Sequence, residues 1–260
     1  KEKSDAKHFF IQGQTMNPRL TDLWVYLAAS PLLGLTLTLL AYQVALWFHQ
    51  RCRFHPLANP VLVAIALVSA VLLATDMDYP QYFDGAQFVH FLLGPATVAL
   101  AIPLYAQWSR LQAMATPLLI ALVVGCLTAV ISAWAVGAAL GASHASLMSL
   151  APKSVTTPIA MAVAQTLGGL PALAAALVVL SGVFGAIFAP SLCQLLGIQD
   201  DAVRGFAIGL AAHGIGTARA FQISEQTGAF AALGMGLNGV LTALALPWLM
   251  PWLNTLLPGT

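Results

Sequence analysis

A single lysine, Lys153, lies in a long part of the sequence that carries no other residue of formal charge. Residues 111–152 before it and residues 154–199 after it contain no Asp, Glu, Lys or Arg. An ionisable side chain at membrane depth is costly and usually faces the interior of a helical bundle or a water-filled cavity. We therefore expect Lys153 to bind a ligand. The alternative is that its ammonium group reaches the membrane surface and only anchors a helix end.

Hydroxyl side chains and a proline follow Lys153 directly. Ser154, Thr156 and Thr157 precede Pro158, which is well suited to the first turn of a helix. We expect Thr157 to cap that helix, so that its hydroxyl lies beside backbone N–H groups that have no partner within the first turn. An ammonium group, three hydroxyls and a helix N-terminus are together suited to binding an anion. These five residues form the first predicted substrate-binding segment.

A second polar interruption surrounds His213 in another apolar region. Gly214 and Gly216 follow the histidine, and each glycine disfavours a continuous helix by about 1 kcal/mol relative to alanine. We therefore expect a broken helix here. Thr217 and the backbone at both glycines are predicted to form the wall of the substrate site opposite Lys153.

Two residues of this second segment have two interpretations each. Imidazole has an unperturbed pKa of about 6.5, so His213 is a candidate proton carrier. The alternative is a packed histidine that is bonded to a backbone carbonyl. Arg219 either contacts the substrate or, near the end of a span, contributes to the orientation of the chain in the membrane.

Gly94, Pro95 and Thr97 predict a third broken helix, because proline leaves a backbone carbonyl without its helical partner. A shift of 120 residues aligns this segment with residues 214–217, whereas a shift of 63 aligns Pro95 with Pro158. The two registers compete, and each predicts an internal repeat. Broken segments in corresponding positions of two halves are typical of transporter sites near the bilayer midplane.

The composition predicts an integral membrane protein. Of 260 residues, 59% are hydrophobic and 7% are charged, whereas about 25% are charged in an ordinary soluble domain. A spanning helix needs about 20 apolar residues, so the uncharged runs can hold about seven or eight spans. Apolar and polar residues do not alternate with a period of two, which argues against an outer-membrane barrel. The expected fold is all-α, a polytopic bundle of membrane helices that is transporter-like in having broken helices.

The sequence predicts no metal site, no cofactor and no nucleic-acid partner. The cysteines Cys52, Cys126 and Cys193 have no paired spacing, and the histidines have no partner four residues away. The net charge is +1, without a basic surface interleaved with aromatic residues. An enzyme is not expected either, because the motifs supply no acid–base pair and no nucleophile with an orienting base.

The first fifteen residues differ from the rest of the chain. Residues 1–15 carry five charged side chains and are too polar to span a membrane. We expect this stretch to be a tag or linker remnant outside the fold, and residues 16–260 to form one transmembrane domain. The alternative is a natural arm on one side of the membrane.

Several of these segments together resemble the LrgB/CidB family. The resemblance rests on residues 153–161, 168–171, 213–219 and 228–230, with further support from residues 59–60 and 93–105. It extends over about residues 20–257, so the transmembrane domain is identified as LrgB-like.

The resemblance implies a multi-pass protein of the bacterial inner (cytoplasmic) membrane, or of the plastid inner envelope in a plant. Such proteins are called antiholin-like, and a small membrane subunit of the LrgA/CidA type is the implied partner. Small-residue helix faces also suggest a homo-oligomer. Relatives are implicated in moving pyruvate and similar short hydroxy- or keto-acids, and a plastid relative carries glycolate and glycerate.

Two functions of different classes remain open. The first is a secondary transporter for small monocarboxylates of the pyruvate, glycolate, glycerate and lactate class, held between the Lys153 and His213 segments. The alternative is an antiholin-like regulator of murein hydrolase export and cell lysis without transport activity of its own. The isolated cation and the broken helices favour the transporter, because a regulator has no evident need of them.

Overall fold

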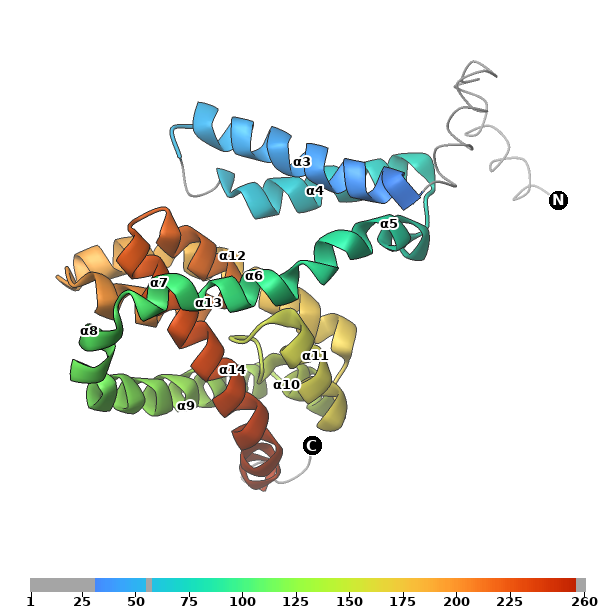
Figure 1. The fold of residues 1–260 in the computed structure, drawn as a ribbon. Coiled ribbons are helices and arrows are strands. Elements are labelled where there is room, and N and C mark those ends of the chain that lie inside the picture. Colours follow the sequence, from blue (N-terminus) through green and yellow to red (C-terminus); the bar gives the residue numbers. More distant parts are fainter. Residues whose placement is uncertain (1–30, 55–57, 256–260) are drawn as a thin grey trace, which may run out of the picture. The chain divides into compact units, whose positions relative to one another are not determined.

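The computed structural model describes residues 31–54 and 58–255, and every regular element within these ranges is a helix (Figure 1). The predicted all-α fold is confirmed. Residues 1–15 lie outside the described ranges, so their assignment to a tag or linker stays a prediction. The chain divides into two compact units, Lys1–Gly94 and Pro95–Thr260, which are described separately. The single domain expected over residues 16–260 stays a prediction.

Three helices of the first unit pack together. They are α3 (Pro31–Arg51), α4 (Pro60–Thr75) and α5 (Tyr79–Phe91), and α3 contacts both of the others. Asn59 caps α4, because its side-chain oxygen accepts hydrogen bonds from the N–H groups of Val61 and Leu62, with Pro60 in the first turn. Asn59 thus satisfies two N–H groups for which lipid offers no acceptor.

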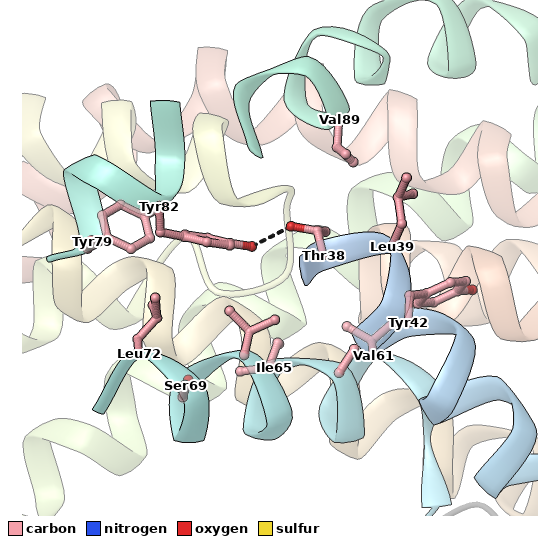
Figure 2. A pocket seen from close by; sticks show the side chains of 12 residues that line it. Thr38, Leu39, Tyr42, Val61, Ile65, Ser69, Leu72, Tyr79, Tyr82 and Val89 are labelled. Carbon is pink, nitrogen blue, oxygen red and sulfur yellow. Dashed lines mark hydrogen bonds between the residues drawn. The ribbon is translucent and has the colours of Figure 1, made fainter. Parts of the chain in front are cut away.

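A cavity of about 550 Å³ lies between α3, α4 and α5 (Figure 2). Its walls are mostly apolar, as Ile65 and Leu72 illustrate. The hydroxyl oxygens of Thr38 and Tyr82 share a hydrogen bond of 2.8 Å that joins α3 to α5. Gly34 allows this approach, because a Cβ there would overlap the carbonyl oxygen of Tyr82. The residues that line this cavity include none of the predicted substrate-binding residues.

The second unit is organised around its last helix. Its helices are α6 (Leu93–Ala99, whose first two residues belong to the first unit), α7 (Ala101–Tyr105), α8 (Trp108–Ala113), α9 (Ala115–Ala139), α10 (His144–Leu150), α11 (Thr157–Thr166), α12 (Pro171–Leu195), α13 (Asp201–Phe221) and α14 (Glu225–Asn254). In Figure 1, α14 (red) runs through the middle of this unit, and it packs against α7, α9, α11 and α13. It contributes to two apolar clusters, one shared with α9, α10 and α11 and one shared with α9 and α13.

Glycines let α13 and α14 approach with their backbones in contact. Gly205 and Gly209 are four residues apart on α13, and a Cβ at either would overlap a carbonyl oxygen of α14, at Thr227 and Ala231 respectively. The hydrophobic effect gives no driving force between helices in lipid, so close contact between small residues takes its place. The α13–α14 hairpin is therefore a tightly packed support for residues on either helix.

Five helical segments among the described residues are long and apolar enough to cross a membrane. They are Leu32–Arg51, Tyr79–Tyr105, Ala115–Ala139, Pro171–Leu195 and Glu225–Asn254. The other predicted spans correspond to helices that are short or interrupted, since α4 has 16 residues, α10 has 7, α11 has 10 and α13 contains a kink. Many large apolar side chains on α9, α12 and α14 are exposed, as a lipid-facing surface requires.

Gly94, Pro95 and Thr97, where the sequence predicts a broken helix, all belong to α6. Single turn residues, Leu92 and Leu100, flank α6, and both have right-handed helical φ and ψ. They lie within Tyr79–Tyr105, one of the helical segments long enough to span a membrane. A broken helix at these residues stays a prediction.

Polar contacts hold the start of α13. Asp200 caps the helix, accepting hydrogen bonds from the N–H groups of Ala202 and Val203, and it forms an ion pair with Arg110 of α8 at 2.5 Å. The hydrogen bond from Val203, supported by the bond from Ala202 and by the guanidinium of Arg110, holds the pKa of the Asp200 carboxyl below its usual range. The folded protein therefore favours the ionised carboxylate.

Replacing Asp200 with alanine should lower the free energy of unfolding by about 1 kcal/mol at neutral pH, because the cap is lost. The Asp200 carboxylate stabilises the fold above its unfolded-state pKa, and this contribution disappears as the pH falls through the lower folded-state pKa. Asp200→Asn keeps a capping oxygen without the charge and is the matched control. Thermal unfolding in mild detergent should show a steeper loss of stability in acid for the wild type than for Asp200→Asn. Equal acid dependence of the two proteins would contradict this account.

Candidate functional site

Lys153 lies in a non-helical segment, residues 151–156, that separates α10 from α11. Ser154 is buried, whereas Lys153 is half-buried, and the Lys153 Nζ donates a hydrogen bond to Ser154 Oγ at 3.1 Å. The ion pairs formed between described residues join Arg110 to Asp200 and Arg204 to Asp201 and do not include Lys153. The geometry thus leaves the ammonium group available to an anionic ligand.

The start of α11 differs from the prediction by one residue. Thr157 is the first helical residue, and Thr156, with φ −67° and ψ 150°, is the N-cap. The prediction that Thr157 caps this helix is therefore wrong, because the extended backbone of a cap falls one residue earlier and Pro158 takes the second helical position. The Thr156 side chain makes no capping hydrogen bond. Its hydroxyl and the N–H groups of the first turn can therefore turn toward a ligand.

The second interruption is centred on His213 itself. Its φ of 40° and ψ of −134° lie outside the helical region and divide α13 into two helical runs. Positive φ in a non-glycine residue is strained, and the pattern of glycines predicted the break without locating it there. The two glycines also differ. A Cβ at Gly216 would overlap Ala212, whereas a Cβ at Gly214 would meet only the Met235 sulfur at 3.9 Å.

The His213 ring is held against α12. The residue is 4% exposed, and Nε2 lies 2.9 Å from the Val178 carbonyl oxygen. Because a carbonyl can only accept, Nε2 carries the hydrogen. Gly182 makes room for the ring, since a Cβ there would overlap it, and the Thr217 hydroxyl donates to the His213 carbonyl at 2.8 Å. These contacts support the interpretation of His213 as a packed histidine bonded to a backbone carbonyl.

One side chain of α14 joins the two interruptions. Asn238 is 1% exposed, and its Nδ2 donates to the carbonyl oxygens of Ser154 and Leu210, both at 3.1 Å. In a regular α-helix the Leu210 carbonyl would accept from the N–H of Gly214, so the amide reaches α13 at its break. The hydroxyl of Thr242, one turn further along α14, donates a hydrogen bond of 3.4 Å to Asn238 Oδ1. The two interruptions therefore lie side by side.

A second connection between them runs through α12. The Ser181 hydroxyl lies 2.6 Å from the Lys153 carbonyl oxygen and 3.0 Å from that of Val178, to which His213 is also bonded. Its single proton can serve either carbonyl. Neither Ser181 nor Asn238 was predicted as a site residue. Each is a polar side chain within an apolar span, which is the sequence signal that could have found it.

The remaining predicted residues have other surroundings. Arg219 Nη1 donates to Gln222 Oε1 at 2.7 Å near the end of α13, about 9 Å along the helix axis from His213. This contact supports the interpretation of Arg219 as a residue at a span end. Gly94, Pro95 and Thr97 are exposed on α6 and stay predictions.

The Lys153 segment carries types of group that can bind an anion. The Lys153 segment supplies an ammonium group, the hydroxyls of Ser154, Thr156 and Thr157, and the N-terminus of a ten-residue helix. Among the residues that the structure describes, no three His, Cys, Asp or Glu side chains gather as metal ligands would.

Comparison with known proteins establishes the family. The profile of the LrgB-like family matches residues 38–252, which include both interruptions. The uncharacterized protein YwbG of Bacillus subtilis (strain 168) is 34% identical over 222 residues, which is 85% of this chain and 98% of YwbG. Antiholin-like protein LrgB of Bacillus cereus (strain B4264) is 29% identical over 225 residues, or 86% of this chain and 98% of that protein. No solved structure matches the chain. This multi-pass membrane protein belongs to the LrgB-like family.

Proposed function

We propose that this protein moves a small organic anion across the membrane and binds it where its two helix interruptions meet. The observation that carries the proposal is the pair of hydrogen bonds from Asn238 to the Ser154 and Leu210 carbonyls. These bonds support a single site with a lysine on one wall and a broken helix on the other. An intramembrane cation beside broken helices is typical of transporter binding sites.

The donors favour a short monocarboxylate of the pyruvate, glycolate, glycerate and lactate class. The carboxylate would pair with the Lys153 ammonium group and accept hydrogen bonds from Thr156, Thr157 and the first turn of α11. Gly214 would form part of the opposite wall, because a Cβ there would meet only the Met235 sulfur, at 3.9 Å. Thr217 would stabilise the backbone of that wall, because its hydroxyl donates to the His213 carbonyl.

A second function is favoured by the names of the relatives rather than by the geometry. The relative from Bacillus cereus (strain B4264) is named antiholin-like protein LrgB, which agrees with the antiholin-like alternative. In this alternative the chain regulates murein hydrolase export together with an LrgA/CidA-type subunit or a second copy of itself. It would then carry no substrate, and the polar contacts between the interruptions would only stabilise the fold.

Counterflow in proteoliposomes distinguishes the two functions. Vesicles that contain the intact, inserted protein should accumulate at least one of labelled pyruvate, lactate, glycolate or glycerate. Lys153→Met keeps the apolar stem but removes the charge, so it should insert normally while the affinity for the anion falls about ten- to hundredfold, the usual range for a lost charge-assisted hydrogen bond. Absence of flux for all four acids in the wild type would favour the regulator. Impaired insertion with normal flux per inserted molecule would reduce Lys153 to an anchor.

The two glycines after His213 give a matched pair of variants. Gly214→Ala should leave the thermal stability unchanged, because the added methyl would meet only the Met235 sulfur at 3.9 Å, yet it should weaken binding of the transported acid. Gly216→Ala should lower the stability by about 1–3 kcal/mol, since its methyl would overlap Ala212 in a packed interior. Unfolding temperature and counterflow affinity are measured for both. Normal affinity in Gly214→Ala would show that the anion does not approach this wall.

The packing of His213 generates a prediction about pH. His213→Gln retains an amide that can donate to the Val178 carbonyl, so we expect uptake to keep the pH profile of the wild type, even where its rate is reduced. Uptake is measured from pH 5 to pH 8, the range around the unperturbed imidazole pKa of about 6.5. A profile that becomes flat in the variant would instead make His213 the proton carrier.

A further inference from the structure

Asn238 uses one planar amide group to hold both helix interruptions. Its Nδ2 carries two hydrogens, and the two acceptors within 3.1 Å are the Ser154 carbonyl of the first interruption and the Leu210 carbonyl of the second. These acceptors are 84 and 28 residues away along the chain. We propose that Asn238 is a positioning residue that couples the two interruptions, so that a backbone change at one is transmitted to the other.

The surroundings of Asn238 fix the direction of its amide. The Asn238 side chain is 1% exposed, and Ser154 and Leu210, whose carbonyls it binds, are buried as well. Thr242 lies 3.4 Å from Oδ1, and the Cys126 sulfur of α9 lies 3.5 Å from the Thr242 hydroxyl. A buried polar chain thus runs from α9 through α14 to both interruptions. Because Oδ1 is held on one side, Nδ2 stays directed at the two carbonyls.

The coupling is expected because the Ser154 and Leu210 carbonyls bind the same rigid amide group of Asn238. If the Ser154 carbonyl moves when the neighbouring hydroxyls bind an anion, the amide must either follow it or lose a hydrogen bond in a dry interior. Following it disturbs the Leu210 carbonyl, three residues before the strained backbone of His213. The coupling itself is independent of transport, and only its effect on anion binding rests on the proposed function.

Hydrogen exchange followed by mass spectrometry tests the coupling in the full chain in mild detergent. Asn238→Leu is close to isosteric and removes both donations, so exchange should become about tenfold faster in peptides covering residues 151–160 and in peptides covering residues 207–217. Ser181→Ala removes a donor to the Lys153 carbonyl and so perturbs the first interruption. With Asn238 in place it should accelerate exchange in both sets of peptides, whereas added to Asn238→Leu its further effect should be confined to the first set. Peptides from α9, in the same unit as both interruptions, report general unfolding of that unit and should not change.

The proposal is overturned if Asn238→Leu accelerates exchange at one interruption alone or equally in all peptides, or if Ser181→Ala affects the second set equally with and without Asn238. If Asn238→Leu does not fold, Asn238→Ala replaces it, since a methyl group removes both donations and adds neither bulk nor charge. Thr242→Val leaves both donors and removes the contact that fixes them, so it should give the same two-site pattern with smaller amplitude. Unchanged exchange in Thr242→Val together with one-site acceleration in Asn238→Ala also overturns the proposal.

Counterflow with the same variants separates this inference from the proposed function. Where the wild type transports an acid, Asn238→Leu should weaken its affinity more than Ser181→Ala does, because it disturbs both walls of the site directly. Two-site acceleration of exchange with no transport by the wild type would leave the coupling in place and remove the proposed function. Acceleration at one interruption alone, together with normal transport by the wild type, would remove the coupling and leave the proposed function in place.

Discussion

Backbone groups that an interrupted helix releases inside a bilayer must find partners within the protein, because lipid offers none. This constraint organises the second unit. The carbonyls of Ser154 and Leu210 are satisfied by Asn238, and the carbonyl of Lys153 by Ser181. Neighbouring helices therefore contribute their polar side chains where a break releases an acceptor. The interruptions expose donors and charge to a ligand only because the rest of their backbone is held in this way.

The sequence predicts where helices are interrupted better than it predicts which side chains bind the backbone groups released there. Lys153 and His213 are recognisable because each is a polar residue in a long apolar context. The partners are harder to predict, since Asn238 and Ser154 are far apart in the chain and meet through the packing of α14 against α11. The sequence pattern also does not predict at which residue the helix breaks. Glycines near His213 predict an interruption, but the positive φ falls on the histidine, whose ring is tied to Val178.

Composition predicts the fold class reliably and the number of spans less well. Hydropathy reports how much of a segment can face lipid, which identifies α9, α12 and α14 without difficulty. It underestimates helices that are covered by other helices. α13 is such a case, because its glycines lie against the α14 backbone and its middle is interrupted. The N-cap of α11 shows the same limit on a smaller scale, since the proline predicts a helix start and the local backbone decides that Thr156 is the cap.

The arrangement of α13 and α14 also has a consequence for biogenesis. α13 carries Asp201, Arg204 and Arg219, and its Leu210 carbonyl accepts from a side chain made 28 residues later. During synthesis, the α13 segment emerges before the donor exists. The hydrogen bond to the Leu210 carbonyl can therefore form only once the chain has been extended through Asn238. The contacts of His213 with α12 have no such delay, because Val178 and Gly182 precede α13 in the chain.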